Sequence, residues 1–353
     1  MELFFDVLPL LISTVFICAI GYGILVVIRR QRDFSEGDPG IGTIRRVYFY
    51  TVSLVSLMMT TNGIVQIGQY VLNFAFADDL LSSSQTRLAL GVSLVIVGLP
   101  LWLLHWRMIG KYVREIPVEA NSIVRKIYIY LILMVSLGIS IEAGLSLVQW
   151  GFNVRTFSGY SLAAILVWVA VWLFHWVLEL REGQHTQGTR TVRRLYLYIV
   201  LSVTLVSAAL GLAHFIHAVL REAYGVLATV EMLGDSGIWP VSTMALSTVL
   251  ITFPVWAIHW LYFAKWDHGS VLRQIYLYGL AVFGGVITIL IAIGVMVYGV
   301  LVWTIGVSYD ENVWSHFSFS PGILTSLIVG GGVLVFHWVQ ANRERLASTM
   351  DIE

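Results

Sequence analysis

The sequence contains little charge and almost no cysteine. Charged residues make up 12 % of its 353 residues, and Cys18 is the only cysteine. A single thiol excludes intrachain disulfide frameworks, thiolate metal clusters and CxxC redox chemistry within one chain. The segments between the apolar runs are too short for a folded soluble domain. Basic residues occur singly or in pairs at the ends of these runs, a pattern that gives no support for nucleic-acid binding.

Familiar catalytic signatures are also missing. The chain has no nucleophile elbow, no HExxH sequence and no phosphate-binding loop, and its glycines do not open a nucleotide-binding turn. We therefore expect a protein that is not an enzyme, and no residue is predicted to be catalytic.

Long apolar segments dominate what remains. Hydrophobic residues make up 58 % of the chain, and runs of about 20 residues are long enough to cross the bilayer core. Because the runs are continuously apolar, they predict helices and not the strands of a barrel. The prediction is an all-α integral membrane protein with nine transmembrane helices, near 7–28, 47–71, 88–109, 127–149, 160–180, 195–219, 243–264, 275–303 and 322–340.

The N-terminal segment Met1–Asp6 lacks the basic region that opens a signal peptide, so the first apolar run is predicted to be a retained span. When alternate loops are assigned to opposite faces, all of the 21 Lys and Arg residues except Arg87, Arg155 and Arg221 fall on one face. The positive-inside rule makes that face cytoplasmic. We expect a prokaryotic plasma membrane protein with its N-terminus outside and its C-terminus in the cytoplasm.

Two short signatures alternate four times along the chain. The first is a basic residue followed by two tyrosines at alternate positions, and it begins at Arg45, Arg125, Arg193 and Arg273. The second is a His-Trp pair that closes an apolar run, at His105, His175, His259 and His337. Such repetition predicts a repeated architecture. Each unit is expected to cross the membrane outward and to return, so the repeats are parallel and not inverted.

These boundaries divide one membrane domain into an N-terminal helix with its linker and four helix hairpins. The expected divisions are 1–44, 45–124, 125–192, 193–272 and 273–353. Over residues 45–338, the Arg-x-x-Tyr-x-Tyr starts and the Pro-x-Trp-x-x-His-Trp ends resemble an uncharacterised prokaryotic multi-pass membrane family, known only as a domain of unknown function. The resemblance implies the fold and supplies no activity.

The four His-Trp histidines have two interpretations. Imidazole is a common axial ligand, and helix bundles hold cofactors between facing helices, so haem or chlorin binding is one interpretation. The simpler one is structural: a histidine at the interface bonds a tyrosine phenol or a backbone carbonyl and fixes the helix end. Because the residue occurs in every unit, we favour the structural role for His105, His175, His259 and His337.

A polar stripe distinguishes the four outgoing helices from one another. Offsets of four and three residues place three side chains on one helical face, at the same depth in each helix. The stripe consists of Asn62, Gln66 and Gln69, then Glu142, Ser146 and Gln149, then His214 and His217, while the fourth helix is apolar there. Glu142 is the only acidic residue predicted deep inside a span, where an ionisable group is a functional-site hypothesis.

The sequence therefore predicts a polar pocket, open toward the outer face, that binds or conducts a small solute, cation or proton. Its predicted ligand-binding residues are Glu142, His214, His217, Asn62, Gln66, Gln69 and Gln149. A metal held by His214, His217 and Glu142 is an alternative, and so is a role as a pigment-binding or structural subunit. The expected partners are the lipid bilayer and either membrane proteins or further copies of the chain.

Overall fold

A computed structural model describes residues 41–76, 84–182, 186–228, 238–265, 267, 269–306 and 312–350, and no strand occurs in these ranges. The predicted span at 7–28, with Cys18, lies outside the described residues. The long helices are α2 (Ile41–Phe76), α3 (Ser84–Glu115), α4 (Ile123–Gly151), α5 (Gly159–Glu182), α6 (Gln187–Ala228), α7 (Trp239–Ile258), α9 (Phe283–Thr304) and α11 (Ser320–Met350). The shorter elements are η1 (Pro117–Asn121), η2 (His259–Ala264), α8 (Val271–Gln274), η3 (Ile275–Val282) and α10 (Val313–His316).

Seven helical segments of the described chain are long and apolar enough to cross a membrane, which supports the predicted membrane class. Two of them join several elements, because α7 continues into the π-helical η2, and α8, η3 and α9 form one rod. The predicted span at 47–71 lies within α2, which is not among the seven. Its polar residues Thr60, Thr61, Asn62 and Gln66 lower its hydropathy.

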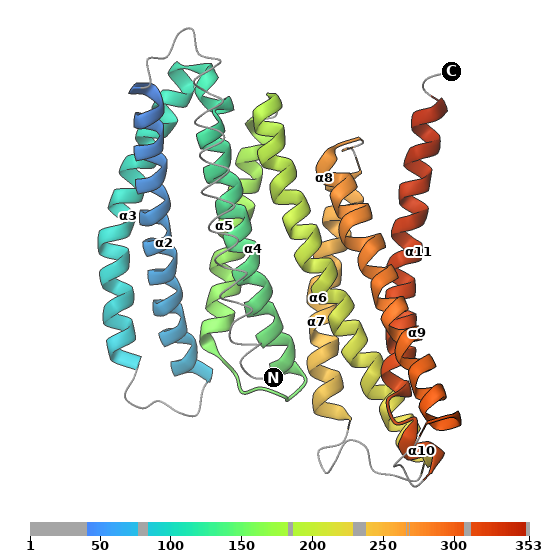
Figure 1. Ribbon diagram of the computed structural model, residues 1–353. Coiled ribbons are helices and arrows are strands. Elements are labelled where there is room, and N and C mark those ends of the chain that lie inside the picture. Colours follow the sequence, from blue (N-terminus) through green and yellow to red (C-terminus); the bar gives the residue numbers. More distant parts are fainter. Residues whose placement is uncertain are drawn as a thin grey trace.

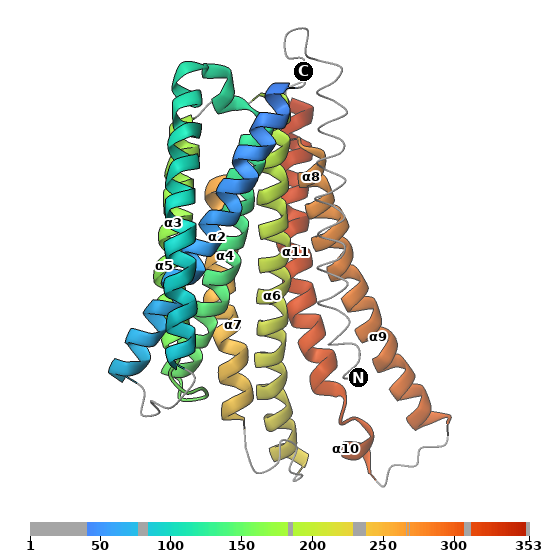
Figure 2. The ribbon, with the colours of Figure 1, turned by 90° about the vertical axis from the view of Figure 1, so that its left-hand side faces the viewer.

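Helices that follow one another along the chain pack together in pairs. α2 packs against α3, α4 against α5, α6 against α7, and α9 against α11. Contacts of α2 with α5, of α4 with α6 and α7, and of α6 with α11 join these pairs into one row (Figure 1). In the view turned by 90°, α9 leans outward toward the end that carries α10 (Figure 2).

Close packing between α9 and α11 depends on glycine. A Cβ atom built on Gly285 would lie 2.9 Å from the carbonyl oxygen of Gly330 and 2.9 Å from Cβ of Leu334. The two backbones therefore approach at a point where no side chain fits. Small residues at interfaces of this kind permit dense helix packing in membranes.

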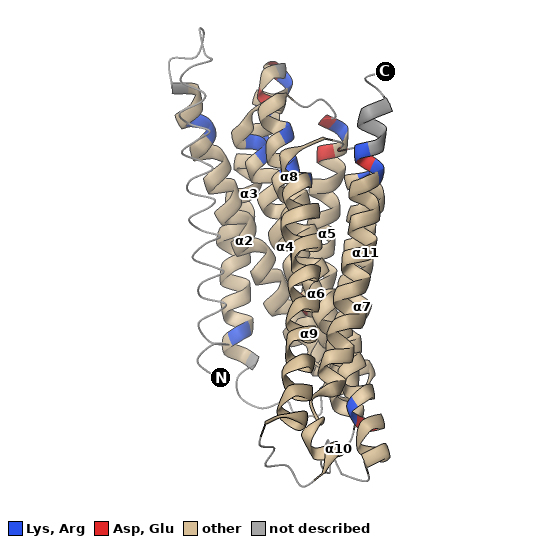
Figure 3. Ribbon diagram, turned by 45° about the vertical axis from the view of Figure 1, so that its right-hand side comes forward, with Lys and Arg blue, Asp and Glu red and all other residues tan. Residues whose placement is uncertain are grey.

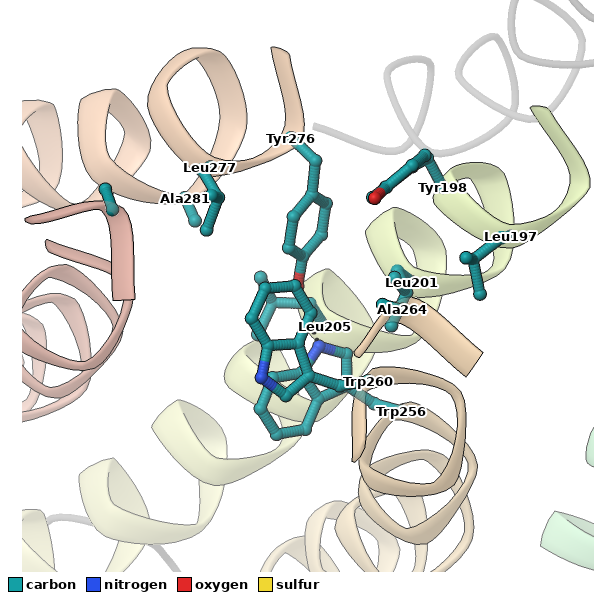
Figure 4. Packing of buried hydrophobic residues seen from close by; sticks show 11 residues of the cluster. Leu197, Tyr198, Leu201, Leu205, Trp256, Trp260, Ala264, Tyr276, Leu277 and Ala281 are labelled. Atoms are coloured by element: carbon teal, nitrogen blue, oxygen red, sulfur yellow. Dashed lines mark hydrogen bonds between the residues drawn. The ribbon is translucent and has the colours of Figure 1, made fainter. Parts of the chain in front are cut away.

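Aromatic residues fill the interior where α6, α7 and η3 meet (Figure 4). The indole rings of Trp256 and Trp260 are stacked with an interplanar angle of 6°. Nε1 of Trp256 donates a hydrogen bond of 2.7 Å to the hydroxyl oxygen of Tyr276. This bond satisfies a buried donor that would otherwise destabilise the interior.

Two serines cap the starts of α4 and α8. Oγ of Ser122 accepts a hydrogen bond from the backbone N–H of Arg125, and Oγ of Ser270 accepts one from that of Arg273. Each serine is thus an N-cap, a position at which a side-chain oxygen satisfies a helix-terminal N–H group. The caps place both arginines in the first turn of their helices, at one end of the bundle.

Candidate functional site

A polar cavity of about 220 Å³ lies beside the C-terminal part of α4 and the start of α5. Its lining combines one carboxylate, one guanidinium and several hydroxyl groups. The lining residues are Ile139, Glu142, Ala143, Ser146, Arg155, Thr156, Ser158, Tyr160 and Ser161. Glu142, predicted to be the charged centre of a pocket, thus lies in a cavity with a cation that sequence reasoning did not select.

The turn between α4 and α5 brings Arg155 back over α4. Asn153 has a φ angle of 58°, and it follows the last turn of α4. The N–H of Val154 donates to the carbonyl of Gln149, and the N–H of Asn153 donates to that of Trp150. These two bonds form a Schellman cap with asparagine in the left-handed position. Nη1 of Arg155 then donates a 3.1 Å hydrogen bond to Oγ of Ser146.

The start of α5 forms the other side of the cavity. The backbone N–H of Gly159 donates a 2.8 Å hydrogen bond to Oδ1 of Asn73 on α2, which holds the first turn of α5 in place. Ser158, Tyr160 and Ser161 from this region line the cavity. A helix N-terminus carries a partial positive charge, so this side favours anionic groups.

The cavity does not include the two histidines that were predicted to join Glu142. His214 is exposed, and its Nδ1 is hydrogen-bonded to the carbonyl of Leu210 on its own helix, at 2.8 Å. The ring of His217 faces α11, since a Cβ atom on Gly322 would lie 3.8 Å from its Cε1. Equivalent positions on α4 and α6 therefore face different neighbours. Within the described residues, no group of three or more His, Cys, Asp or Glu could hold a metal ion.

The four predicted amides also lie outside the lining of the cavity. Asn62 is exposed and donates to the carbonyl of Met58, at 2.8 Å. Gln66 and Gln69 on α2 are half-buried, and Oε1 of Gln66 has no hydrogen-bond partner among the described residues. Gln149 on α4 is buried. The predicted stripe is thus divided among separate surfaces.

A buried ionic cluster joins α4 and α5 at the opposite end of the bundle. Nζ of Lys126 lies 2.6 Å from Oε2 of Glu179 and 2.9 Å from Oε2 of Glu182. Arg125 pairs with Glu182 as well, and the hydroxyl of Tyr130 donates to Oε1 of Glu179 at 2.7 Å. Glu179 is 4 % exposed and lies near the end of α5, so a second acidic residue is buried at the end of a span, although not deep inside one. The attraction between the paired charges offsets the free-energy cost of removing them from water.

Cations in the other Arg-and-Tyr signatures also pair with a carboxylate. The pairs are Arg46 with Glu119 at 2.7 Å, Arg194 with Asp267 at 2.7 Å, and Arg273 with Glu344 at 2.6 Å. Most of the charged residues lie at this end of the bundle (Figure 3). Sequence reasoning missed the partners, although Glu182 and Glu344 each follow the His-Trp histidine by seven residues.

Asp267 lies between two spans and accepts three hydrogen bonds. Burial alone would raise its pKa, but donation from Ser270, Tyr198 and Arg194 lowers the pKa below its ordinary value. The distances are 2.6 Å from Oγ of Ser270, 2.9 Å from the hydroxyl of Tyr198 and 2.7 Å from Nε of Arg194. The carboxylate thus connects the start of α6 to the loop after η2.

The four His-Trp histidines share one local geometry. Nδ1 of each lies 2.8 or 2.9 Å from a backbone carbonyl four residues earlier, in His105, His175, His259 and His337. Because a carbonyl oxygen only accepts, Nδ1 carries the proton, and Nε2 is left as an acceptor. Nε2 lies 3.3 Å from the Tyr196 hydroxyl in His259 and 3.2 Å from the Tyr276 hydroxyl in His337.

His175 differs from these two. Its Nε2 is buried and has no hydrogen-bond partner among the described residues. The neighbouring Tyr128 hydroxyl instead lies 3.1 Å from Oγ of Ser53 on α2. In His259 and His337, both ring nitrogens have protein partners, which leaves neither free to ligate haem iron without breaking a bond.

Comparison with known proteins identifies a family but no characterised relative. No curated protein and no solved structure matches the chain. The family described as Domain of unknown function (DUF5671) matches residues 46–157 and 228–318, more than half of the chain. Each matched segment contains one Pro-x-Trp-x-x-His-Trp end, at Pro100–Trp106 and at Pro254–Trp260. The chain therefore belongs to the DUF5671 family of domains of unknown function.

Proposed function

We propose that this protein binds a small polar solute at the outer face of a prokaryotic plasma membrane. In this proposal the chain has nine spans, one N-terminal helix and four repeated hairpins, with divisions at 44, 124, 192 and 272. The binding site is the cavity that contains Glu142 and Arg155.

The orientation is supported by the charges. Basic residues gather at the end of the bundle that holds the signatures beginning at Arg45, Arg125, Arg193 and Arg273. Cytoplasmic loops carry the excess of Lys and Arg, so that end is the cytoplasmic one. The cavity then opens on the outside, because α4 ends and α5 begins there.

The repeat is supported by contacts that recur between successive helices. Each of the pairs α2–α3, α4–α5, α6–α7 and α9–α11 packs together, and each return helix carries a histidine bonded to its own backbone. A geometry that recurs at every unit stabilises the scaffold, so we assign His105, His175, His259 and His337 to structure.

One observation carries the functional proposal: a carboxylate and a guanidinium line the same small cavity. Glu142 lies in the last third of α4, an apolar span, and its side chain is exposed. An ionisable side chain within a span carries an energetic cost, which is offset when a solute or cation binds the charge. Ile139 and Ala143 line the cavity beside Glu142, and Glu142 and Arg155 are both exposed, so a solute can reach the two charges from outside the protein.

The test is ligand-dependent stability of the protein in lipid nanodiscs. Thermal unfolding is recorded with a panel of amino acids, amines, carboxylates and sugars, for the wild type, Glu142→Gln and the outer-face control Glu222→Gln. A solute at about 100 times its Kd stabilises the folded state by ~2.7 kcal/mol. We expect at least one solute to stabilise the wild type and the control but not Glu142→Gln. A panel without effect, or an effect that Glu142→Gln retains, contradicts the proposal.

A further inference from the structure

We infer that the solute taken by this cavity is a small zwitterion, with its cationic group at Glu142 and its carboxylate at Arg155. This inference rests on the proposed function and adds the chemical class of the ligand.

The two charges are close in the fold but do not neutralise each other. Ser146, which accepts the hydrogen bond from Arg155, lies one turn after Glu142 on the same face of α4. Among the described residues, Glu142 makes no ion pair or hydrogen bond, and the bond of Arg155 to Ser146 involves a neutral hydroxyl. Each charged group therefore retains capacity for a partner of opposite sign, and one molecule with both charges satisfies both.

The lining of the cavity contains groups that bind an anion and one group that binds a cation. Arg155, the hydroxyl of Ser158 and the N-terminal turn of α5 are the anion-binding groups. A guanidinium binds a carboxylate with paired, charge-assisted hydrogen bonds, and a helix N-terminus adds favourable potential. Glu142 provides the only negative charge in the lining. A cationic group of the ligand is therefore expected to bind at Glu142.

The volume of the cavity matches a short molecule. The volume of about 220 Å³ is below the range of roughly 300–1,000 Å³ typical of sites for drug-sized ligands. Ile139 and Ala143 supply apolar contact for a few methylene groups between the charged ends. An amino acid or a betaine has this size and charge distribution, whereas a free cation leaves Arg155 without a partner of opposite charge.

The experiment compares three molecules with the same carbon chain: γ-aminobutyrate, butylamine and butyrate. Affinity is measured by isothermal titration calorimetry on the full chain in nanodiscs. Each end contributes a charged hydrogen-bonding partner, so γ-aminobutyrate is expected to bind roughly 10- to 100-fold more tightly than either single-charge analogue. This comparison uses only the wild-type protein, so its result does not depend on whether a substituted protein folds.

Variants then assign the two ends. Glu142→Gln is expected to reduce affinity for γ-aminobutyrate and butylamine, and Arg155→Gln to reduce affinity for γ-aminobutyrate and butyrate. Glu222→Gln and Arg221→Gln, at the outer end of α6, serve as matched controls and are expected to bind all three probes as the wild type does. Butylamine bound as tightly as γ-aminobutyrate would overturn the zwitterion while leaving a solute site at Glu142. If none of the three probes binds, the inference is overturned. The proposed function is then tested separately by the wider panel of solutes.

Discussion

Nζ of Lys126 lies 2.6 Å from Oε2 of Glu179, and the two side chains are 0 % and 5 % exposed. An ion pair this deeply buried is coupled to the stability of the helices that carry it. Removal of one partner leaves an uncompensated charge, which costs far more than an exposed pair contributes. The pair therefore fixes α4 against α5, the two helices whose far ends form the cavity.

Glu179→Ala is expected to destabilise the protein by about 3 kcal/mol, near the lower end for a broken buried pair because Glu182 still contacts Lys126. Thermal unfolding in detergent measures the change. The matched control is Glu115→Ala, which breaks the exposed pair with Lys111 at 3.8 Å and is expected to cost less than about 1 kcal/mol. If the two variants lower the unfolding temperature equally, the buried pair contributes no more to stability than the exposed pair.

The stability contributed by Asp267 is expected to depend on pH. Its folded-state pKa is lowered, so the contribution is complete above the ordinary aspartate value of about 3.9 and is lost as pH falls through the folded value. The unfolding midpoint of Asp267→Asn should lie below that of the wild type at neutral pH, with the difference narrowing below about pH 4. A difference between wild type and Asp267→Asn that stays constant with pH would contradict the assignment.

Gly285→Ala is expected to separate α9 from α11. The added Cβ would lie 2.9 Å from the Gly330 carbonyl oxygen, and overpacking of this kind typically costs about 1–3 kcal/mol. Gly294→Ala on the same helix meets nothing within 4 Å, so it is expected to be neutral or stabilising by up to about 1 kcal/mol. Unfolding midpoints of the two variants provide the measurement. The packing argument fails if the two substitutions have the same effect.

The proposed orientation predicts which loops a membrane-impermeant maleimide reaches in intact cells. In a Cys18→Ser background, Asn153→Cys, in the exposed turn after α4, should be labelled from outside. Thr186→Cys, exposed just before α6, should be labelled only after the cells are opened. The reverse pattern would place the cavity on the cytoplasmic side.

Local patterns predicted the helices well, and they predicted contacts between helices poorly. Apolar runs located the described helices because length and hydropathy are properties of single segments. The stripe of Glu142, His214 and His217 failed as a common surface because its alignment assumed that equivalent helices face one centre. In the structure α6 presents His217 to α11 instead. Rotation of one helix relative to another depends on packing that no single segment encodes.

The position of Arg155 over α4 follows from a local signal in the sequence. Asparagine after the last turn of a helix is a local signal for a Schellman cap, and such a cap reverses the chain over the preceding helix. Asn153 provides that signal, two residues before Arg155. The carboxylate that pairs with each Arg-and-Tyr signature is harder to predict from the sequence, because its distance from the His-Trp histidine is not constant. The spacing from His105 to Glu119 differs from that between His175 and Glu182.

We propose that the cavity with Glu142 and Arg155 holds a small solute in the native membrane. The most direct measurement is a cryo-electron microscopy map of the protein purified from its native membrane without added ligands. We expect density for a short molecule between the Glu142 carboxylate and the Arg155 guanidinium, and we expect Glu142→Gln to lack this density. A well-resolved cavity that contains only water in the native protein would show that it holds no such solute.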